Sequence, residues 1–136
     1  TQDLGTVLAG GCGILGNPNT YAVLEDLQEA VQRIQSQSKT YCIVPDFSAH
    51  WIQSRAHNPL PVDWPQNIEL PTAALQSRVE ERLNGSRGRM VVLVQKFKTD
   101  YLAQGIVSMD DSFKIVNFVT QNFRKVDETR YFALYE

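Results

Sequence analysis

The sequence has little cysteine, little histidine and no long hydrophobic run, and each shortage excludes a class of proteins. Two cysteines, Cys12 and Cys42, are too few for a disulfide framework and form no CxxC pair. We expect both thiols to be free, and the alternative is a single bridge between them in an oxidising compartment. No apolar stretch approaches the ~20 residues of a membrane-spanning helix. The sequence therefore predicts a soluble protein without a membrane span, and the cytoplasm is slightly favoured as its compartment.

An excess of basic residues is also lacking. Thirteen Lys and Arg stand against 15 Asp and Glu, which gives a net charge of −2. Proteins that bind nucleic acid usually present a basic surface, so nucleic acid is not an expected partner. The charge is uneven, with a balance of −4 over residues 1–70 and +2 over residues 71–136. We therefore expect any site for a small anionic ligand on the C-terminal half.

Two stretches have the apolar periodicity of helices. In residues 21–37 the spacing of Leu24, Leu27, Val31 and Ile34 predicts a helix with one apolar face. In residues 72–83 the spacing of Leu75, Val79 and Leu83 predicts a second helix, and the following Asn-Gly pair is a typical helix end. These are the two main helices that we expect.

The remaining apolar runs are short and rich in β-branched and aromatic residues. Several follow one another near the C-terminus, separated by short polar breaks that contain Asp, which is typical of an antiparallel meander. The predicted fold class is α+β, with a single antiparallel sheet of about four or five strands and both helices packed on one face. We expect one domain over residues 1–136, with residues 1–19 as a Gly-rich N-terminal arm. The predicted strands are 40–44, 90–94, the two runs 101–103 and 105–107 taken together, 113–119 and 131–135.

A glycine-rich segment is the first candidate ligand site. Residues 11–16 match G-x-G-x-x-G, a pattern that lets backbone N–H groups reach a pyrophosphate, so Gly11 and Gly13 are candidate ligand-binding residues. Three features argue against a dinucleotide site: the apolar run before the glycines is short, Pro18 falls where a helix should continue, and no acidic residue follows about 20 residues later. The alternative is a turn or an arm.

The second candidate is the segment that holds both histidines and both tryptophans. Asp46 and His50 are four residues apart, so on a helix they would share a face. Together with Trp51 they are candidate ligand-binding residues, and His57 and Trp64 follow closely. The spacing matches no metal motif, so no metal ligands and no cofactor are predicted. Ordinary packing and capping roles are the alternative.

The third candidate is a partner-binding surface near the C-terminus. Lys96 and Lys98 alternate with an aromatic residue and would share one face of a strand. Tyr131 and Tyr135 lie in the terminal strand, and tyrosine is enriched at protein interfaces. These four residues are therefore candidates for contact with a partner protein or with a second copy of the chain.

No arrangement of residues stands out as catalytic, and the catalytic residues of an enzyme, if the chain is one, are unknown. The sequence thus favours a non-catalytic regulatory or assembly module that binds a partner protein or a small ligand. The alternative is a small nucleotide- or metal-dependent enzyme that uses Gly11–Gly16 together with residues 46–64. That alternative requires the two stretches to meet at one cleft.

Overall fold

The computed structural model describes residues 1–52 and 54–136. Within these residues, no helix has the length and apolar character needed to cross a membrane. The 3-10 helices are η1 (Leu4–Thr6) and η2 (Thr99–Tyr101). The helices are α1 (Pro18–Gln35), α2 (Ala49–Ile52), α3 (Ala73–Asn84) and α4 (Lys114–Asn122). The strands are β1 (Gln2–Asp3), β2 (Leu15–Gly16), β3 (Thr40–Val44), β4 (Met90–Gln95), β5 (Lys125–Glu128) and β6 (Phe132–Tyr135).

The described strands form two sheets, so the predicted single antiparallel sheet is wrong. β1 and β2 pair as a small antiparallel sheet, and the main sheet has the order β3-β4-β6-β5. β3 and β4 are parallel, whereas β4 pairs with β6, and β6 with β5, in antiparallel fashion. The parallel pair arises because α3 carries the chain back to the starting end of the sheet before β4 begins.

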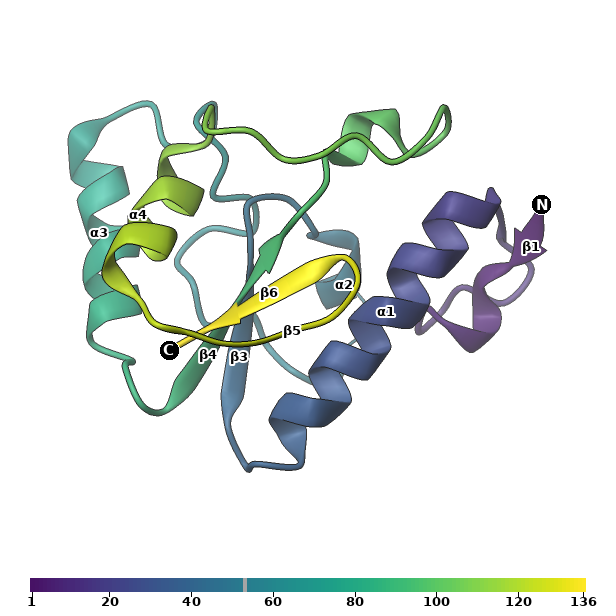
Figure 1. Cartoon of the computed structure of the whole chain (residues 1–136), viewed down its shortest axis with the longest axis horizontal. Coiled ribbons are helices and arrows are strands. Elements are labelled where there is room, and N and C mark those ends of the chain that lie inside the picture. Colours follow the sequence, from purple (N-terminus) through teal and green to yellow (C-terminus); the bar gives the residue numbers. More distant parts are fainter. Residues whose placement is uncertain (53) are drawn as a thin grey trace.

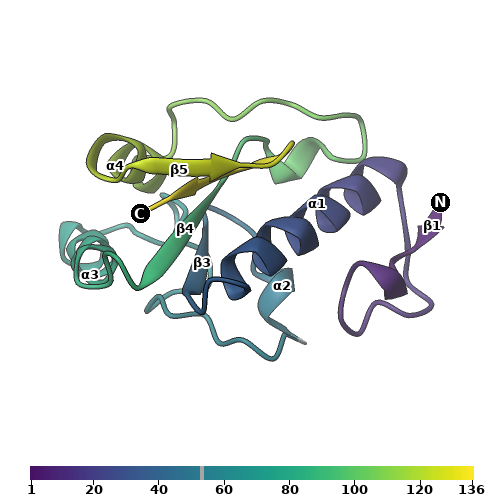
Figure 2. The ribbon, with the colours of Figure 1, turned by 60° about the horizontal axis from the view of Figure 1, so that its bottom comes forward.

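Helices cover both faces of the main sheet, which corrects the prediction that they share one face. α1 lies on one side and α3 and α4 lie on the other, while the β1–β2 arm lies beyond α1 (Figures 1 and 2). Alternation along β3 shows the reason: Tyr41 and Ile43 belong to the core beneath α1, and Cys42 and Val44 belong to the core beneath α3 and α4. Successive side chains of a strand point to opposite faces of the sheet, so a strand that is apolar at successive positions is buried by packing on both faces.

Residues 113–119, predicted as a strand, belong mostly to α4. Their β-branched residues suggested a strand, but Ile115, Val116 and Val119 are buried on one helical face that packs with α3. The strand predicted over 101–103 and 105–107 is also wrong, because that stretch forms part of η2 and a loop. β5 was not predicted, since all four of its residues are exposed and three are charged.

The two predicted helices and the strands at 40–44, 90–94 and 131–135 are confirmed, with shifted ends for α1, α3, β4 and β6.

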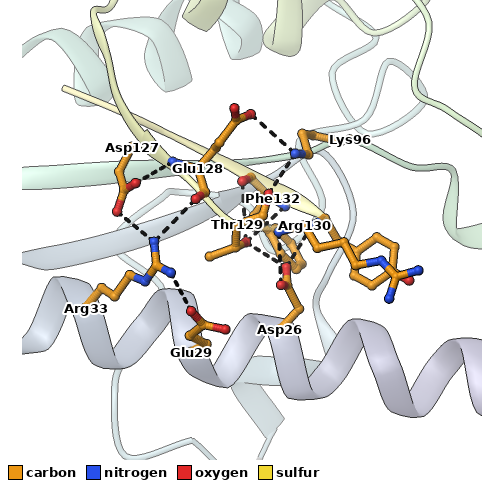
Figure 3. Close-up of polar contacts among 10 residues, drawn as sticks. Asp26, Glu29, Arg33, Lys96, Asp127, Glu128, Thr129, Arg130 and Phe132 are labelled. Carbon is orange, nitrogen blue, oxygen red and sulfur yellow. Dashed lines mark hydrogen bonds and ion pairs between the residues drawn. The ribbon is translucent and has the colours of Figure 1, made fainter.

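The β5–β6 hairpin is tied to α1 by the buried Asp26 (Figure 3). Its carboxylate accepts hydrogen bonds from Thr129 Oγ1 at 2.6 Å, Arg130 N at 3.1 Å and Tyr131 N at 2.8 Å. Farther along α1, Arg33 Nη1 donates to Asp127 Oδ2 at 3.0 Å. These contacts hold the C-terminal edge of the sheet over α1.

Candidate functional site

Two long loops leave the sheet at the same edge. Residues 45–72 follow β3 and residues 96–113 follow β4, and because β3 and β4 are parallel, both loops begin at the carboxyl ends of the strands. Among the described residues each contains only one short helix, and each loop exceeds the ~12–15 residues of an ordinary connection. Loops of this length are usually functional, and ligands of open α/β sheets bind outside the carboxyl ends of strands. This edge is the natural place to look for a site.

Gln95 fixes the start of the first loop against the second. It is the last residue of β4 and is only 1 % exposed. Its Oε1 accepts a hydrogen bond from the Asp46 N–H at 2.6 Å, and its Nε2 donates to Thr99 Oγ1 at 3.1 Å. Thr99 Oγ1 in turn donates to the Asp46 carbonyl at 3.2 Å. The backbone at Asp46 therefore has a defined position relative to β4.

Asn67 joins the far ends of the same two loops. Its Nδ2 donates to the Ser112 carbonyl at 2.6 Å, and its Oδ1 accepts from the Lys114 N–H at 3.1 Å. Phe113, at the N-cap position of α4, supplies no capping side chain. Asn67 thus satisfies a free N–H at the start of α4 from a distant part of the chain, a role that a local Asn or Asp usually fills.

Between these two ties lies a small pocket, here called the carboxyl-edge pocket. Its volume is about 150 Å³, roughly the space that five water molecules occupy in the liquid at ~30 Å³ each. Both loops contribute side chains. The lining residues are Pro45, Asp46, Gln66, Lys98, Thr99, Asp100, Tyr101, Met109, Ser112 and Phe113.

The pocket contains two carboxyl groups, Asp46 and Asp100. Partial burial raises the pKa of Asp46, and the nearby negative charge of Asp100 raises it further. The neighbouring polar side chains of Thr99 and Gln66 act in the opposite direction without cancelling the rise. Lys98 also lines the pocket, but its ammonium pairs with Asp110, which is not a lining residue. The pocket therefore has acidic character and is rich in hydrogen-bond acceptors.

Asp46 and His50 do not share a helical face, because α2 begins only at Ala49. His50 instead contacts Tyr41, with 2.6 Å between its Nε2 and the tyrosine Oη. Burial lowers the pKa of His50 to about 4, so its imidazole is neutral at neutral pH. Within the part of the chain that the structure describes, no group of three or more His, Cys, Asp or Glu is placed to hold a metal ion.

Trp51 lines a different cavity, here called the indole pocket, with a volume of about 550 Å³. The segment that the sequence suggested as one pocket is therefore divided between two cavities, with Asp46 in the first and Trp51 in the second. The indole pocket is lined by Ser48, Trp51, Ile52, Ala56, His57, Asn58, Asp63 and Trp64.

The glycine segment folds around a carboxylate of its own chain. Gly13, with φ +79°, donates its N–H to Asp3 Oδ2 at 2.9 Å, and Gly5 N–H donates to Asp3 Oδ1 at 2.7 Å. A Cβ at Gly11 would approach the carbonyl oxygens of Leu4 and Leu8 to 2.9 Å. These glycines thus serve a close backbone turn. Among the described residues, none of 11–16 lines either pocket.

The four candidate partner-binding residues largely have partners within the chain. Lys96 Nζ donates to the Thr129 carbonyl at 2.7 Å, and Lys98 pairs with Asp110. Tyr131 is only 8 % exposed, and Tyr135 is partly buried. These side chains offer less free surface than their positions in the sequence suggested.

Sequence reasoning did not single out Gln66, Thr99, Asp100 or Ser112, which the structure places in the carboxyl-edge pocket. The available signal was their position in the two long loops that follow β3 and β4. Their position in these loops indicates a shared site only if β3 and β4 are parallel, whereas the sequence pattern predicted an antiparallel meander.

Known proteins offer no further guide to the class of this protein. No protein-family model matches the chain, and neither the curated proteins nor the solved structures contain a significant match. The structure itself defines a mixed α/β protein with helices on both faces of its main sheet and a pocket at the carboxyl ends of two parallel strands.

Proposed function

We propose that this chain is a non-catalytic regulatory module that binds a small molecule carrying a protonated amine in the carboxyl-edge pocket. The observation that carries the proposal is the pair Asp46 and Asp100, which line one pocket between two loops that are tied together. Partial burial and the charge of Asp100 both disfavour the ionised form of Asp46 and raise its pKa, so a cationic partner would favour ionisation. An ammonium group would supply that partner.

The other lining groups suit the same ligand. An ammonium nitrogen has only donors, and Thr99 Oγ1 and the Gln66 carbonyl oxygen are acceptors beside the carboxylates. The rings of Tyr101 and Phe113 offer negative faces to a cation. An anion would instead meet two carboxylates. The small anionic ligand expected from the charge of the C-terminal half is therefore not favoured at this pocket.

The size of the pocket limits the ligand. At about 150 Å³ it is smaller than the ~300–1,000 Å³ typical of sites for drug-sized molecules. The ligand is therefore a small amine, or a larger molecule of which only the amine end enters. The alternative enzyme has less support, because Gly11–Gly16 contributes to neither the pocket of Asp46 nor that of Trp51 among the described residues.

Isothermal titration calorimetry with ethanolamine and 1,4-diaminobutane tests the proposal at neutral pH. We expect saturable binding of at least one probe. Asp46→Asn should weaken it at least tenfold, or about 1.4 kcal/mol, because the amide keeps the shape of the side chain and removes its charge. Asp111→Asn is the matched control, since Asp111 is exposed in the second loop, which also carries Asp100, and does not line the pocket.

Two results would contradict the proposal. One is the absence of saturable binding of either amine to the wild-type chain. The other is equal affinity for the wild type and Asp46→Asn, with circular dichroism showing that both are folded. Equal weakening by Asp46→Asn and Asp111→Asn would point to a general charge effect and would count against a site in the pocket.

A further inference from the structure

Both tryptophans of the chain line the indole pocket. This cavity is separate from the carboxyl-edge pocket, and the described residues of the two linings do not overlap. Trp64 is 46 % exposed and Ile52 is 76 % exposed, so much of the apolar surface here faces solvent. A folded chain usually covers an indole more completely than this, and the exposed ring is available for contact with a ligand.

Trp51 is held rigidly on the inner side of this pocket. Its ring stacks on Tyr41, with 5.4 Å between the ring centroids and 24° between the planes. His50 packs edge-on against the same indole, with a centroid distance of 4.9 Å, and also contacts the Tyr41 hydroxyl. Because three aromatic side chains fix one another, the indole of Trp51 is ordered before any ligand arrives. Such preorganisation reduces the entropic cost of binding.

The polar part of the lining is also ordered. Asn58 Nδ2 donates to the Val62 carbonyl at 2.9 Å and to Asp63 Oδ1 at 3.3 Å, while Asn58 Oδ1 accepts from the Leu60 N–H at 3.1 Å. Asn58 therefore organises the turn that carries Asp63 and Trp64. Ser48 lines the same cavity. The pocket thus combines indole rings with fixed hydrogen-bonding side chains.

We propose that the indole pocket binds a neutral saccharide, a site additional to the amine site. The C–H bonds on the face of a sugar ring carry slight positive charge and pack on the negative face of an indole. The ring hydroxyls can donate to Asp63 and to the remaining acceptor position of Asn58 Oδ1, and they can exchange hydrogen bonds with Ser48.

The charge and size of the pocket favour the same ligand class. Among its described lining residues there is one carboxylate and no Lys or Arg, which disfavours nucleotides and other anions. A volume of about 550 Å³ lies within the ~300–1,000 Å³ range of small-molecule sites and far exceeds what a single methylated ammonium group would fill. A sugar ring with its hydroxyls fits this space better than a compact cation does.

Intrinsic fluorescence tests this proposal, because Trp51 and Trp64 are the only tryptophans and both line the pocket. We would titrate the full chain with cellohexaose, chitohexaose and maltohexaose at millimolar concentrations. At least one should change the emission saturably. Trp64→Ala should weaken binding, measured by calorimetry, at least tenfold, and Asp63→Asn should weaken it with both indoles intact. Ile68→Ala removes an exposed apolar side chain outside the lining and should leave affinity unchanged.

The absence of a saturable response to any of the three oligosaccharides would overturn the proposal. Unchanged affinity in both Trp64→Ala and Asp63→Asn would do the same, because binding would then lie elsewhere. A response to choline without a response to the sugars would show an aromatic site for a cation instead. Asp46→Asn should bind the saccharide as the wild type does, so this test can fail or succeed independently of the amine site.

Discussion

A carboxyl group that is partly removed from water and faces a second carboxylate resists ionisation, and Asp46 is in that position. Since its pKa is higher in the folded chain than in the unfolded chain, the folded state binds more protons between those two pKa values. The contribution of Asp46 to the free energy of unfolding therefore falls as pH rises through that window, starting near the ordinary Asp value of ~3.9.

Asp46→Asn should remove this dependence. We expect the variant to gain stability relative to the wild type as pH rises from about 4 to 7, because the neutral amide does not titrate while all other groups are shared. Melting curves of both proteins across this range check the prediction. Two stability profiles that remain parallel with pH would show that Asp46 is not destabilised when ionised.

Asp26 is a buried carboxylate that accepts three hydrogen bonds. Asp26→Ala would leave the buried Tyr131 N–H without its acceptor, along with the Thr129 hydroxyl. We expect the free energy of unfolding to fall by about 3 kcal/mol. Glu25→Ala, at the adjacent exposed position, should change it by about 0.5 kcal/mol or less. Urea denaturation compares the two, and similar effects would contradict a structural role for Asp26.

The two cysteines differ sharply in environment. Cys12 is exposed, while Cys42 is fully buried and its burial raises the pKa of the thiol. Because the thiolate is the reactive form, iodoacetamide should modify Cys12 in the native chain and spare Cys42, and it should modify both in denaturant. Mass spectrometry of the peptides gives the result. Equal rates at both sites in the native chain would contradict the packing of β3 beneath α3 and α4.

At the level of elements, the start of α4 depends on a side chain from another loop. Asn67→Ala removes both the acceptor for the Lys114 N–H and the donor to the Ser112 carbonyl. We expect a loss of about 1 kcal/mol in the free energy of unfolding, as for other lost helix caps. The same loss should weaken amine binding, because Ser112 and Phe113 line the pocket.

Asn67→Asp is the informative companion variant. It keeps an acceptor at the N-terminus of α4, where negative charge is favourable, and loses only the amide donor. Its stability in urea should therefore lie between those of the wild type and Asn67→Ala. An Asp variant as unstable as the Ala variant would show that the bond to Ser112, and not the capping of α4, carries the effect.

The accuracy of the sequence-based prediction varied between elements for physical reasons. α1 and α3 have clear apolar stripes, and residues 41–44 of β3 and 90–94 of β4 are continuous apolar runs, so their patterns can be recognised without tertiary information. α4 was mistaken for a strand because its β-branched residues favour strands locally, whereas burial of Ile115 and Val119 against α3 decides the outcome. β5 has only exposed residues and therefore lacks an alternating pattern.

At the level of the whole molecule, the decisive feature is the parallel pairing of β3 and β4, which sequence patterns did not reveal. The apolar character of both strands was visible, and continuous apolar strands are typical of sheets that are covered on both faces. The short apolar runs near the C-terminus nevertheless favoured an antiparallel meander over a parallel pair. Once the pairing is known, the two loops and the site that they form follow from topology.

The candidate site could be predicted only in part for the same reason. Asp46 was singled out from its spacing to His50, but the structure places it beside Asp100 and Thr99 from the other loop. Contacts such as those of Gln95 with Asp46 and Asn67 with Lys114 join residues 47 or more positions apart. No local pattern specifies them. The pocket is a product of the arrangement of the whole chain.

The claim that the carboxyl-edge pocket holds a protonated amine is tested most directly by ¹³C NMR titration of the Asp46 carboxyl group, with and without saturating ethanolamine. We expect the Asp46 pKa to lie above the ordinary Asp value in the free protein and to fall when the amine is bound, because the ammonium group favours the ionised carboxylate. An Asp46 pKa that is the same in both samples would contradict the claim.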